Sequence, residues 1–250
     1  MSRLSNSHAV VTGGASGIGL AIARALAGNG AHVTITSRDR SRLQSVTSKN
    51  GGISGVTLDV SDPRSVTKAF ESVDPVDILV NNSATALAAP FERTTLEQLA
   101  SVMAVNLTGV FHCMQAVLPA MRKQQYGRIV NIASTAGLSG YAYASVYAAS
   151  KHAVIGLTRS VAIELAQTGI TANCVCPGFT DTEIVTTAIA NIAKVTGRSE
   201  AETLAEFVEH NPQKRLVTPD EVADTVLWLC GKNSRSINGQ AIAVAGGEIM

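Results

Sequence analysis

The sequence contains little charge and almost no imbalance of charge. Only 16% of its 250 residues are charged, the formal net charge is +1, and hydrophobic residues make up 46%. This balance provides neither the basic surface that binds nucleic acid nor a polybasic segment for an anionic membrane. The composition is typical of a compact protein with much buried surface, and the length suits one large α/β domain.

Long apolar runs are also scarce. The opening residues, MSRLSNSHAVVTGG, contain no apolar run of signal-peptide length. We also expect no segment to reach the roughly 20 apolar residues that a membrane span needs. The sequence therefore predicts a cytoplasmic protein that makes no membrane contact.

Cysteine occurs at four positions: Cys113, Cys174, Cys176 and Cys230. Two of them form a C-x-C pair in ITANCVCPG, which we expect to point to opposite faces of a strand. No second pair has the spacing of metal ligands. The sequence predicts four buried, reduced cysteines and no metal site.

Apolar strand segments alternate with helical segments along the whole chain. Seven strands are expected, at 9–11, 32–36, 53–60, 75–82, 127–134, 169–178 and 239–247. Strands that alternate with helices predict a parallel sheet covered on both faces. No repeat or change of composition divides residues 1–250, so the sequence predicts one doubly wound α/β domain.

A glycine-rich turn, VVTGGASGIG, lies between the first strand and the first helix. Glycines allow a tight turn and let the backbone approach a pyrophosphate, which the helix N-terminus then stabilises. At the end of the second strand stand Ser37 and Arg38, where an acidic residue would bind the ribose hydroxyls of NAD. A hydroxyl and a guanidinium suit a 2′-phosphate, so we expect NADP(H), with NAD(H) as the alternative.

Tyr147 and Lys151 are separated by about one helical turn in VYAASKHAVIGLTRSVAIEL, so their side chains share a helix face. An ammonium beside a phenol favours the ionised phenol, and we expect Lys151 to lower the pKa of Tyr147. The alternative is a tyrosine at the edge of the core beside a lysine that extends to solvent.

Several motifs in a fixed order resemble the classical short-chain dehydrogenase/reductase family over essentially the whole chain. They are T-G-x-x-x-G-I-G at Thr12–Gly19, Asp59-Val60, NNSA at 81–84, VNLTG at 105–109, Ser134 in VNIAS, Tyr147-x-x-x-Lys151 and PGFTDT at 177–182. The resemblance implies a seven-stranded Rossmann-type sheet and hydride transfer between a nicotinamide and an alcohol or ketone. It also implies a catalytic tetrad, which falls on Asn106, Ser134, Tyr147 and Lys151.

The chemistry of ketone reduction agrees with these roles. Tyr147 is the expected general acid, and Ser134 can donate to the developing alkoxide. By resemblance, Lys151 also holds the nicotinamide ribose and Asn106 positions a water on the proton-relay path. The structural alternatives are that Ser134 is only a hydroxyl at a strand end and that Asn106 is only a residue at a helix kink.

The predicted cofactor contacts extend along the carboxyl ends of the strands. They are Gly13, Ser16, Gly17, Ile18, Gly19, Ser37, Arg38, Asp59, Val60, Asn82, Tyr147, Lys151, Pro177, Gly178, Thr180 and Thr182. By resemblance, Asp59 meets the adenine, Val60 packs against it, and Thr182 binds the nicotinamide carboxamide. Asn81 resembles an asparagine that stabilises the sheet. Ala84 stands where the family usually has glycine, and its methyl is expected to change the cofactor fit without abolishing binding.

The long segment 177–215 contains two stretches with one apolar face each. The second opens with Ser199 and Glu202, the spacing of a capping box. Two amphipathic helices at the active-site end of the sheet predict a lid over about 180–215. Ordinary surface packing is the alternative.

The residues expected to contact substrate are mostly apolar: Ser134, Ala136, Leu138, Tyr141, Tyr147 and Phe179, with Tyr143 beside them. Hydroxybutyrate dehydrogenases hold a small carboxylate with polar and basic groups where this chain has Ala86, Ala136 and Ala144. A neutral ketone is therefore expected, and the chain resembles 3-oxoacyl-thioester reductases and 3-hydroxyacyl-CoA dehydrogenases. The alternatives are a reductase of small ketones, an NAD-dependent alcohol dehydrogenase and a non-catalytic cofactor sensor.

The helical segments 96–123 and 147–165 are apolar on every side. A helix of this kind is usually buried on every side. We expect a homo-oligomer, a dimer or a homotetramer, formed through these two segments. A monomer with an extended flank is the alternative.

Overall fold

The computed structural model describes residues 4–249, which form one parallel sheet of seven strands in the order β3-β2-β1-β4-β5-β6-β7. The strands are β1 (His8–Thr12), β2 (His32–Ser37), β3 (Ile53–Thr57), β4 (Ile78–Asn81), β5 (Gly127–Ile132), β6 (Ile170–Pro177) and β7 (Ala241–Val244). All seven expected strands and the Rossmann-type arrangement are confirmed.

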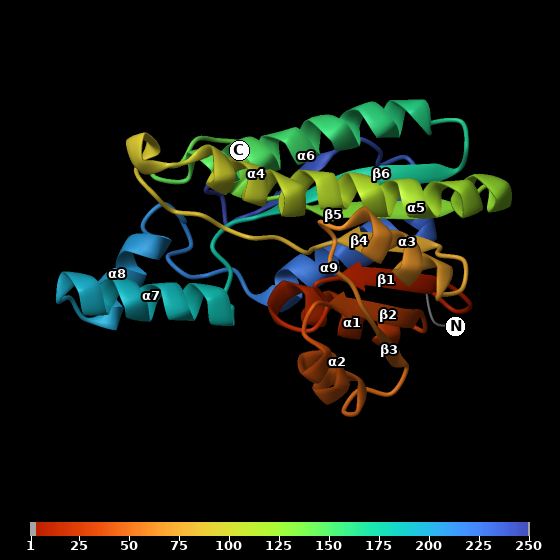
Figure 1. Cartoon of the computed structure of the whole chain (residues 1–250), viewed down its shortest axis with the longest axis horizontal. Helices are drawn as coiled ribbons and strands as arrows, with labels where there is room; N and C mark the ends of the chain where they lie inside the picture. The colour runs from red at the N-terminus through yellow and green to blue at the C-terminus, as the bar shows by residue number, and fades with distance from the viewer. Residues whose placement is uncertain (1–3, 250) are drawn as a thin grey trace.

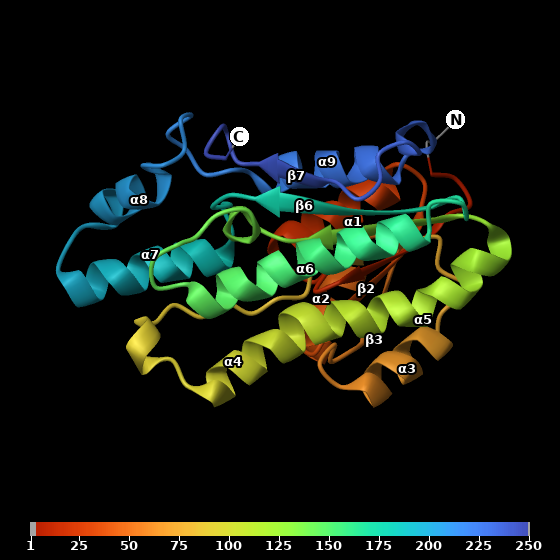
Figure 2. The same ribbon diagram turned by 90° about the horizontal axis from the view of Figure 1, so that it is seen from above.

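Helices cover both faces of the sheet (Figure 2). Around one core lie α1 (Gly17–Gly28), α2 (Arg40–Thr47) and α9 (Pro219–Cys230). Around the other lie α3 (Pro63–Glu71), α5 (Gly109–Gln124) and α6 (Ser145–Glu164), with α4 (Leu96–Met103) leading into α5. Short 3₁₀ turns lie at Phe91–Arg93, Thr135–Gly137 and Lys232–Ser234. The two cores are the two apolar faces of a sheet that is buried on both sides.

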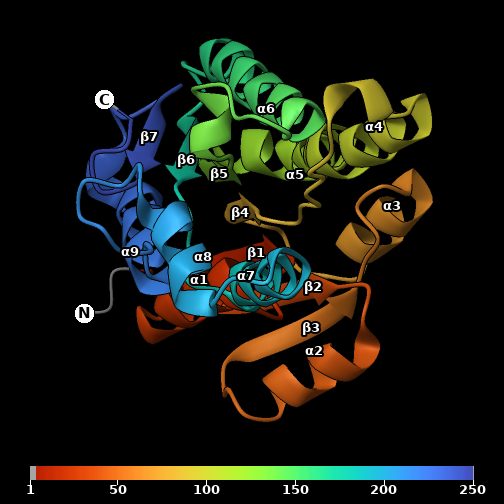
Figure 3. The same cartoon turned by 90° about the vertical axis from the view of Figure 1, so that its left-hand side faces the viewer.

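The strand order reverses between β1 and β4, which are hydrogen-bonded neighbours. In open α/β sheets, ligands bind at the carboxyl ends of the strands beside such a reversal. Figure 3 looks onto this edge of the sheet. Nearly all of the predicted site residues lie at or near it.

The expected helix at 96–123 is a continuous helical run interrupted by a π-helical turn at Ala104–Thr108. By length and composition alone, the run Leu96–Gln124 is long and apolar enough to cross a membrane. The expectation that no segment reaches this length was therefore wrong. Helix α5 contributes Val110, Cys113 and Val117 to the core beneath it, so the apolar side of this run packs on the sheet.

The lid segment forms α7 (Glu183–Thr196) and α8 (Glu200–Val208), which extend beyond the carboxyl ends of the strands (Figure 1). Ser199 caps α8, and its reciprocal bonds with Glu202 confirm the predicted capping box. An ion pair at 3.3 Å joins Arg42 of α2 to Glu183 of α7. The start of the lid therefore lies beside the adenosine-binding end of the predicted cofactor site.

All four cysteines are buried and reduced. The expectation that Cys174 and Cys176 face opposite sides of the sheet was wrong, because residues two apart on a strand point to the same face. Both belong to the core that also contains Cys113, beneath α5 and α6.

Candidate active site

The glycine turn between β1 and α1 has the geometry of a phosphate cradle. Gly13 and Gly17 adopt φ of +65° and +49°, which side-chain-bearing residues rarely adopt. A Cβ on Gly19 would collide with the carbonyl oxygen of Gly13. Ser16 is the N-cap of α1 but makes no side-chain cap bond, and the first turn of α1 contains no acidic residue. The helix N-terminus is thus free to bind an anion.

Asn82 closes the other side of this turn. Its side-chain nitrogen donates to the carbonyl oxygens of Thr12, at 3.1 Å, and of Gly13, at 3.2 Å. The backbone nitrogens of Asn82 and Ser83 both donate to the Thr12 hydroxyl, at 3.0 Å each. Ala84, which stands where the family usually has glycine, is exposed and lies two residues after Asn82.

The adenosine end is formed by the ends of β2 and β3. The pKa of Asp59 is lowered, mainly by the hydrogen bond from the Ser61 hydroxyl at 2.6 Å. Arg38, which is exposed, contributes a smaller part of this lowering. Ser37 accepts the backbone N–H of Asp39 at 3.1 Å. Val60 is buried against Gly109, where an added Cβ would lie 2.8 Å from it.

The segment after β6 returns over the glycine turn. Pro177 ends the strand, and buried Thr180 donates to the Gly178 carbonyl at 3.0 Å. A Cβ on Gly17 would lie 3.3 Å from Thr182, the N-cap of α7, whose side chain makes no cap bond. Together with half-buried Ile18, these residues fit an extended dinucleotide with its pyrophosphate at the start of α1.

The structure brings Ser134 and Tyr147 together. Ser134 follows β5 and Tyr147 lies in the first turn of α6, and the Ser134 hydroxyl is close enough to the phenol to act on its pKa. Lys151 is only 3% exposed, and its ammonium lies 5.7 Å from the centre of the Tyr147 ring. The ammonium donates to the carbonyl oxygen of Ile132 at 2.8 Å. A phenol, a hydroxyl and a buried cation therefore lie together at the carboxyl end of β5.

The expected lowering of the Tyr147 pKa is not found. Burial raises the pKa of this phenol above 10.0, and the nearby Ser134 hydroxyl opposes that shift only in part. Burial also lowers the pKa of Lys151 to about 8. The spacing along the helix was correct, but the cost of burying charge is the largest cause of both pKa shifts.

Asn106 lies in the π-helical turn and is 1% exposed. Its side chain accepts the N–H of Thr85 at 2.8 Å and donates to the Thr85 carbonyl at 2.9 Å. It also donates at 3.0 Å to the hydroxyl of Ser150, which in turn donates to the Tyr147 carbonyl at 2.7 Å. Sequence reasoning missed Thr85 and Ser150, although Ser150 directly precedes Lys151.

Most of the expected substrate residues line the loop that joins β5 to α6. Ala136 is buried, while Leu138 and Tyr141 are half-buried. Phe179 is 38% exposed and packs edge-on against Tyr141, with ring centres 6.4 Å apart. Tyr143 does not join them, because it is 68% exposed and turns the chain with φ of +62°.

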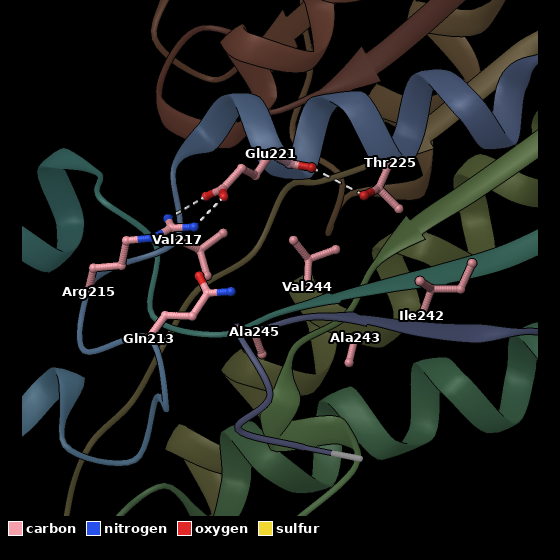
Figure 4. A pocket seen from close by; sticks show the side chains of 10 residues that line it. Gln213, Arg215, Val217, Glu221, Thr225, Ile242, Ala243, Val244 and Ala245 are labelled. Carbon is pink, nitrogen blue, oxygen red and sulfur yellow. Dashed lines mark hydrogen bonds and ion pairs between the residues drawn. The ribbon is translucent and has the colours of Figure 1, made fainter.

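A separate hollow of about 280 Å³ lies between α9 and β7 (Figure 4). Arg215 and Glu221 line it with two short ion-pair contacts, the closer at 2.6 Å. None of the four tetrad positions lines this hollow. It is therefore distinct from the site around Tyr147.

A family model described as enoyl-(acyl carrier protein) reductase matches residues 13–248. Among curated proteins, D-β-hydroxybutyrate dehydrogenase of Rhizobium meliloti (strain 1021) is 36% identical, over 96% of this chain and 97% of that protein. The chain belongs to the short-chain dehydrogenase/reductase family. It is an NAD(P)-dependent enzyme that oxidises an alcohol or reduces a ketone.

Two further proteins are similar to this chain over nearly its whole length. The 3-oxoacyl-[acyl-carrier-protein] reductase MabA of Mycobacterium tuberculosis (strain CDC 1551 / Oshkosh) is 37% identical, over 95% of this chain and 91% of that protein. A crystal structure of an actinorhodin polyketide ketoreductase variant with NADPH superposes with a TM-score of 0.94, at 36% identity and 99% coverage of both chains.

Proposed function

We propose that this enzyme uses NADPH to reduce a neutral ketone, in the first instance a 3-oxoacyl thioester. One observation carries the proposal: the neighbouring side chains of Ser134 and Tyr147 adjoin a loop without charge. Residues 129–150 contain no Asp, Glu, Lys or Arg, so the loop offers no cation to a free carboxylate. The similarity to two named ketoacyl or polyketide ketoreductases supports the same substrate class.

In the proposed reaction, NADPH held along the glycine turn would supply the hydride for the carbonyl carbon. Ser134 donates a hydrogen bond to the oxygen as negative charge develops on it. Tyr147 transfers its phenolic proton to that oxygen, and its raised pKa keeps the phenol protonated beforehand. Asn106 and Ser150 hold the backbone of the first turn of α6, so that the phenol stays aimed at one position.

NADP(H) is the proposed cofactor because Arg38 is exposed at the end of β2 and forms no ion pair within 4 Å with any residue of 4–249. Its guanidinium is therefore free to bind a 2′-phosphate. NAD(H) is the alternative, and the paired titrations of the Arg38 variant described below distinguish the two.

We also propose that the enzyme is a cytoplasmic homo-oligomer, a dimer or tetramer formed through the faces of α4, α5 and α6. Leu96 and Ile163 are each 78% exposed on these helices, and Phe111 is 41% exposed. Exposed apolar side chains of this size on neighbouring helices favour burial against another copy.

The substrate class is tested by initial rates of NADPH oxidation with acetoacetyl-CoA and with ethyl acetoacetate, which share the same acyl group. A strong preference for the thioester supports acyl metabolism. Equal rates, or activity on the ester alone, would identify a reductase of small carbonyl compounds. The similarity to D-β-hydroxybutyrate dehydrogenase makes free acetoacetate with NADH the necessary third assay.

The role of Tyr147 is tested by Tyr147→Phe. We expect kcat to fall by at least about 100-fold, as for loss of a general acid, while the Kd for NADPH stays unchanged. Tyr143→Phe is the matched control, since that exposed phenol should leave kcat as it is. Weakened NADPH binding with normal turnover of the loaded enzyme would contradict the assignment.

A further inference from the structure

Glu248 reaches back from the segment after β7 to the loop that precedes α6. Its carboxylate accepts a hydrogen bond from the hydroxyl of Tyr141, across 107 residues of sequence. The other carboxylate oxygen lies against Gly178, where an added Cβ would be 2.8 Å from it. In Figure 4 the chain leaves β7 after Ala245 and turns towards the green loop before α6. The carboxylate thus lies between the loop that contains Tyr141 and the segment that begins at Gly178.

Tyr141 connects this carboxylate to the short segment after β5 that contains Ser134 and Thr135. Its hydroxyl also lies 2.8 Å from the hydroxyl of Thr135, the residue directly after Ser134. Burial, reinforced by Glu248, raises the pKa of Tyr141 to about 12, so the phenol remains a donor over the working pH range. The Tyr141 ring packs edge-on against Phe179, which packs against Phe207 of α8 with ring centres 4.8 Å apart. The Tyr141–Glu248 bond therefore holds in place an aromatic wall, which consists of Tyr141 in the loop, Phe179 after β6 and Phe207 of α8.

No lysine or arginine within residues 4–249 forms an ion pair with Glu248. The loop beside it is uncharged from 129 to 150. Asp181 adds a second acidic side chain after β6, whereas Glu183 is ion-paired with Arg42. The wall residues themselves, Tyr141, Phe179 and Phe207, carry no positive charge. A negative charge at the edge of a partly desolvated site repels an anionic ligand more strongly than it would in water.

We propose that Glu248 is a specificity-determining residue: its carboxylate positions Tyr141 in the substrate wall and discriminates against ketones that carry a free carboxylate. Neutral esters and thioesters bind at this wall without that repulsion. The inference rests on the proposed ketone reductase activity and deepens it, because it names the group that separates neutral 3-oxoacyl compounds from 3-oxo acids.

The test compares acetoacetate with ethyl acetoacetate, which differ in one negative charge. Glu248→Gln keeps an oxygen that can accept from Tyr141 but removes the charge. We expect it to raise kcat/KM for acetoacetate by about 10-fold and to leave kcat/KM for the ester within about twofold. Tyr141→Phe keeps the charge but breaks the bond, so it should raise KM for the ester and preserve the discrimination. Glu71→Gln, an exposed acid on α3, is the charge-matched control and should change neither value.

An unchanged ratio of the two kcat/KM values in a folded Glu248→Gln variant would overturn the inference, provided that the wild type reduces the ester. A Tyr141→Phe variant that loses the discrimination would overturn it too. If the wild type reduced neither compound nor acetoacetyl-CoA, the proposed function would fail first, and this inference with it. Thermal melting of each variant shows whether it is folded.

Discussion

The buried ammonium of Lys151 lowers the stability of the fold at neutral pH. Burial lowers its pKa to about 8, from 10.5 when exposed. The unfolded chain therefore binds this proton more tightly, and the cost is complete below about pH 8 and disappears as the pH rises towards 10.5. We expect Lys151→Met to abolish turnover and to raise the free energy of unfolding at pH 7 by about 1–3 kcal/mol.

Chemical denaturation at pH 7 and pH 10 measures this effect. The gain from Lys151→Met should shrink at the higher pH, where the wild-type lysine is already largely neutral. Lys49→Met, an exposed lysine after α2, should change the stability little at either pH. A Lys151→Met variant that is less stable than the wild type at pH 7 would show that the bond to the Ile132 carbonyl outweighs the burial cost.

Arg38 should determine the choice between the two nicotinamide cofactors. Loss of a charge-assisted bond to a 2′-phosphate costs about 1.5–3 kcal/mol, so Arg38→Ala should weaken NADPH binding about 10- to 100-fold. NADH lacks this phosphate and should bind within about twofold of its wild-type affinity. Fluorescence titration of both cofactors measures the split, with Arg40→Ala, the exposed first residue of α2, as control. Equal losses for both cofactors would show that Arg38 acts on the fold instead.

At the residue scale, short-range spacing was predictable and long-range contact was not. Tyr147 and Lys151 share a helix face because they are one turn apart. Their pKa shifts depend on how deeply the whole fold buries them. Ser150 and Glu248 acquire their roles from partners 44 and 107 residues away, Asn106 and Tyr141, which no local pattern reveals.

Among the elements, α9 has the best-defined start. The Thr218 hydroxyl accepts the N–H of Glu221, the Thr218 backbone N–H donates to the Glu221 carboxylate, and Pro219 occupies the first turn. Thr218→Ala should lower the free energy of unfolding by about 1 kcal/mol, because it removes this capping box. For a chain of this size the melting temperature should fall by about 2–4 °C.

Thr218→Ser retains a hydroxyl at the cap and should recover most of the loss. Calorimetry of the two variants beside the wild type tests the cap itself. If serine were as destabilising as alanine, the threonine methyl and its packing would be the important feature, and the cap would not.

The helix boundaries show where periodicity stops being informative. Apolar spacing predicted helices at 96–123 and 147–165, and both are present with ends shifted by a few residues at most. The π-helical turn at Ala104–Thr108 was anticipated only in the alternative that Asn106 lies at a helix kink, because its residues are also compatible with an ordinary helix. Contacts of Asn106 with Thr85 and Ser150 accompany the turn, and π-helical turns of this kind often lie at functional sites.

On the scale of the whole molecule, the strand order assembles the site. Ser134, Tyr147 and the glycine turn are far apart in sequence, yet parallel strands direct all their carboxyl ends to one edge of the sheet. Strand–helix alternation was enough to predict this edge. The fit of the lid to the edge was not predictable, since it depends on contacts such as Arg42–Glu183 and Phe179–Phe207.

The proposed oligomeric state is a property of the whole molecule. Ile163, next to the last residue of α6, is 78% exposed, and a lysine there would have to be buried in the proposed interface. Burial of an unpaired charge is costly, so Ile163→Lys should reduce the oligomer to a smaller species. Light scattering coupled to size-exclusion chromatography measures the mass.

Val195→Lys is the matched control, because Val195 is next to the last residue of α7 and 85% exposed, but lies on the lid. A monomeric wild type, or the same mass for wild type and Ile163→Lys, would exclude this interface.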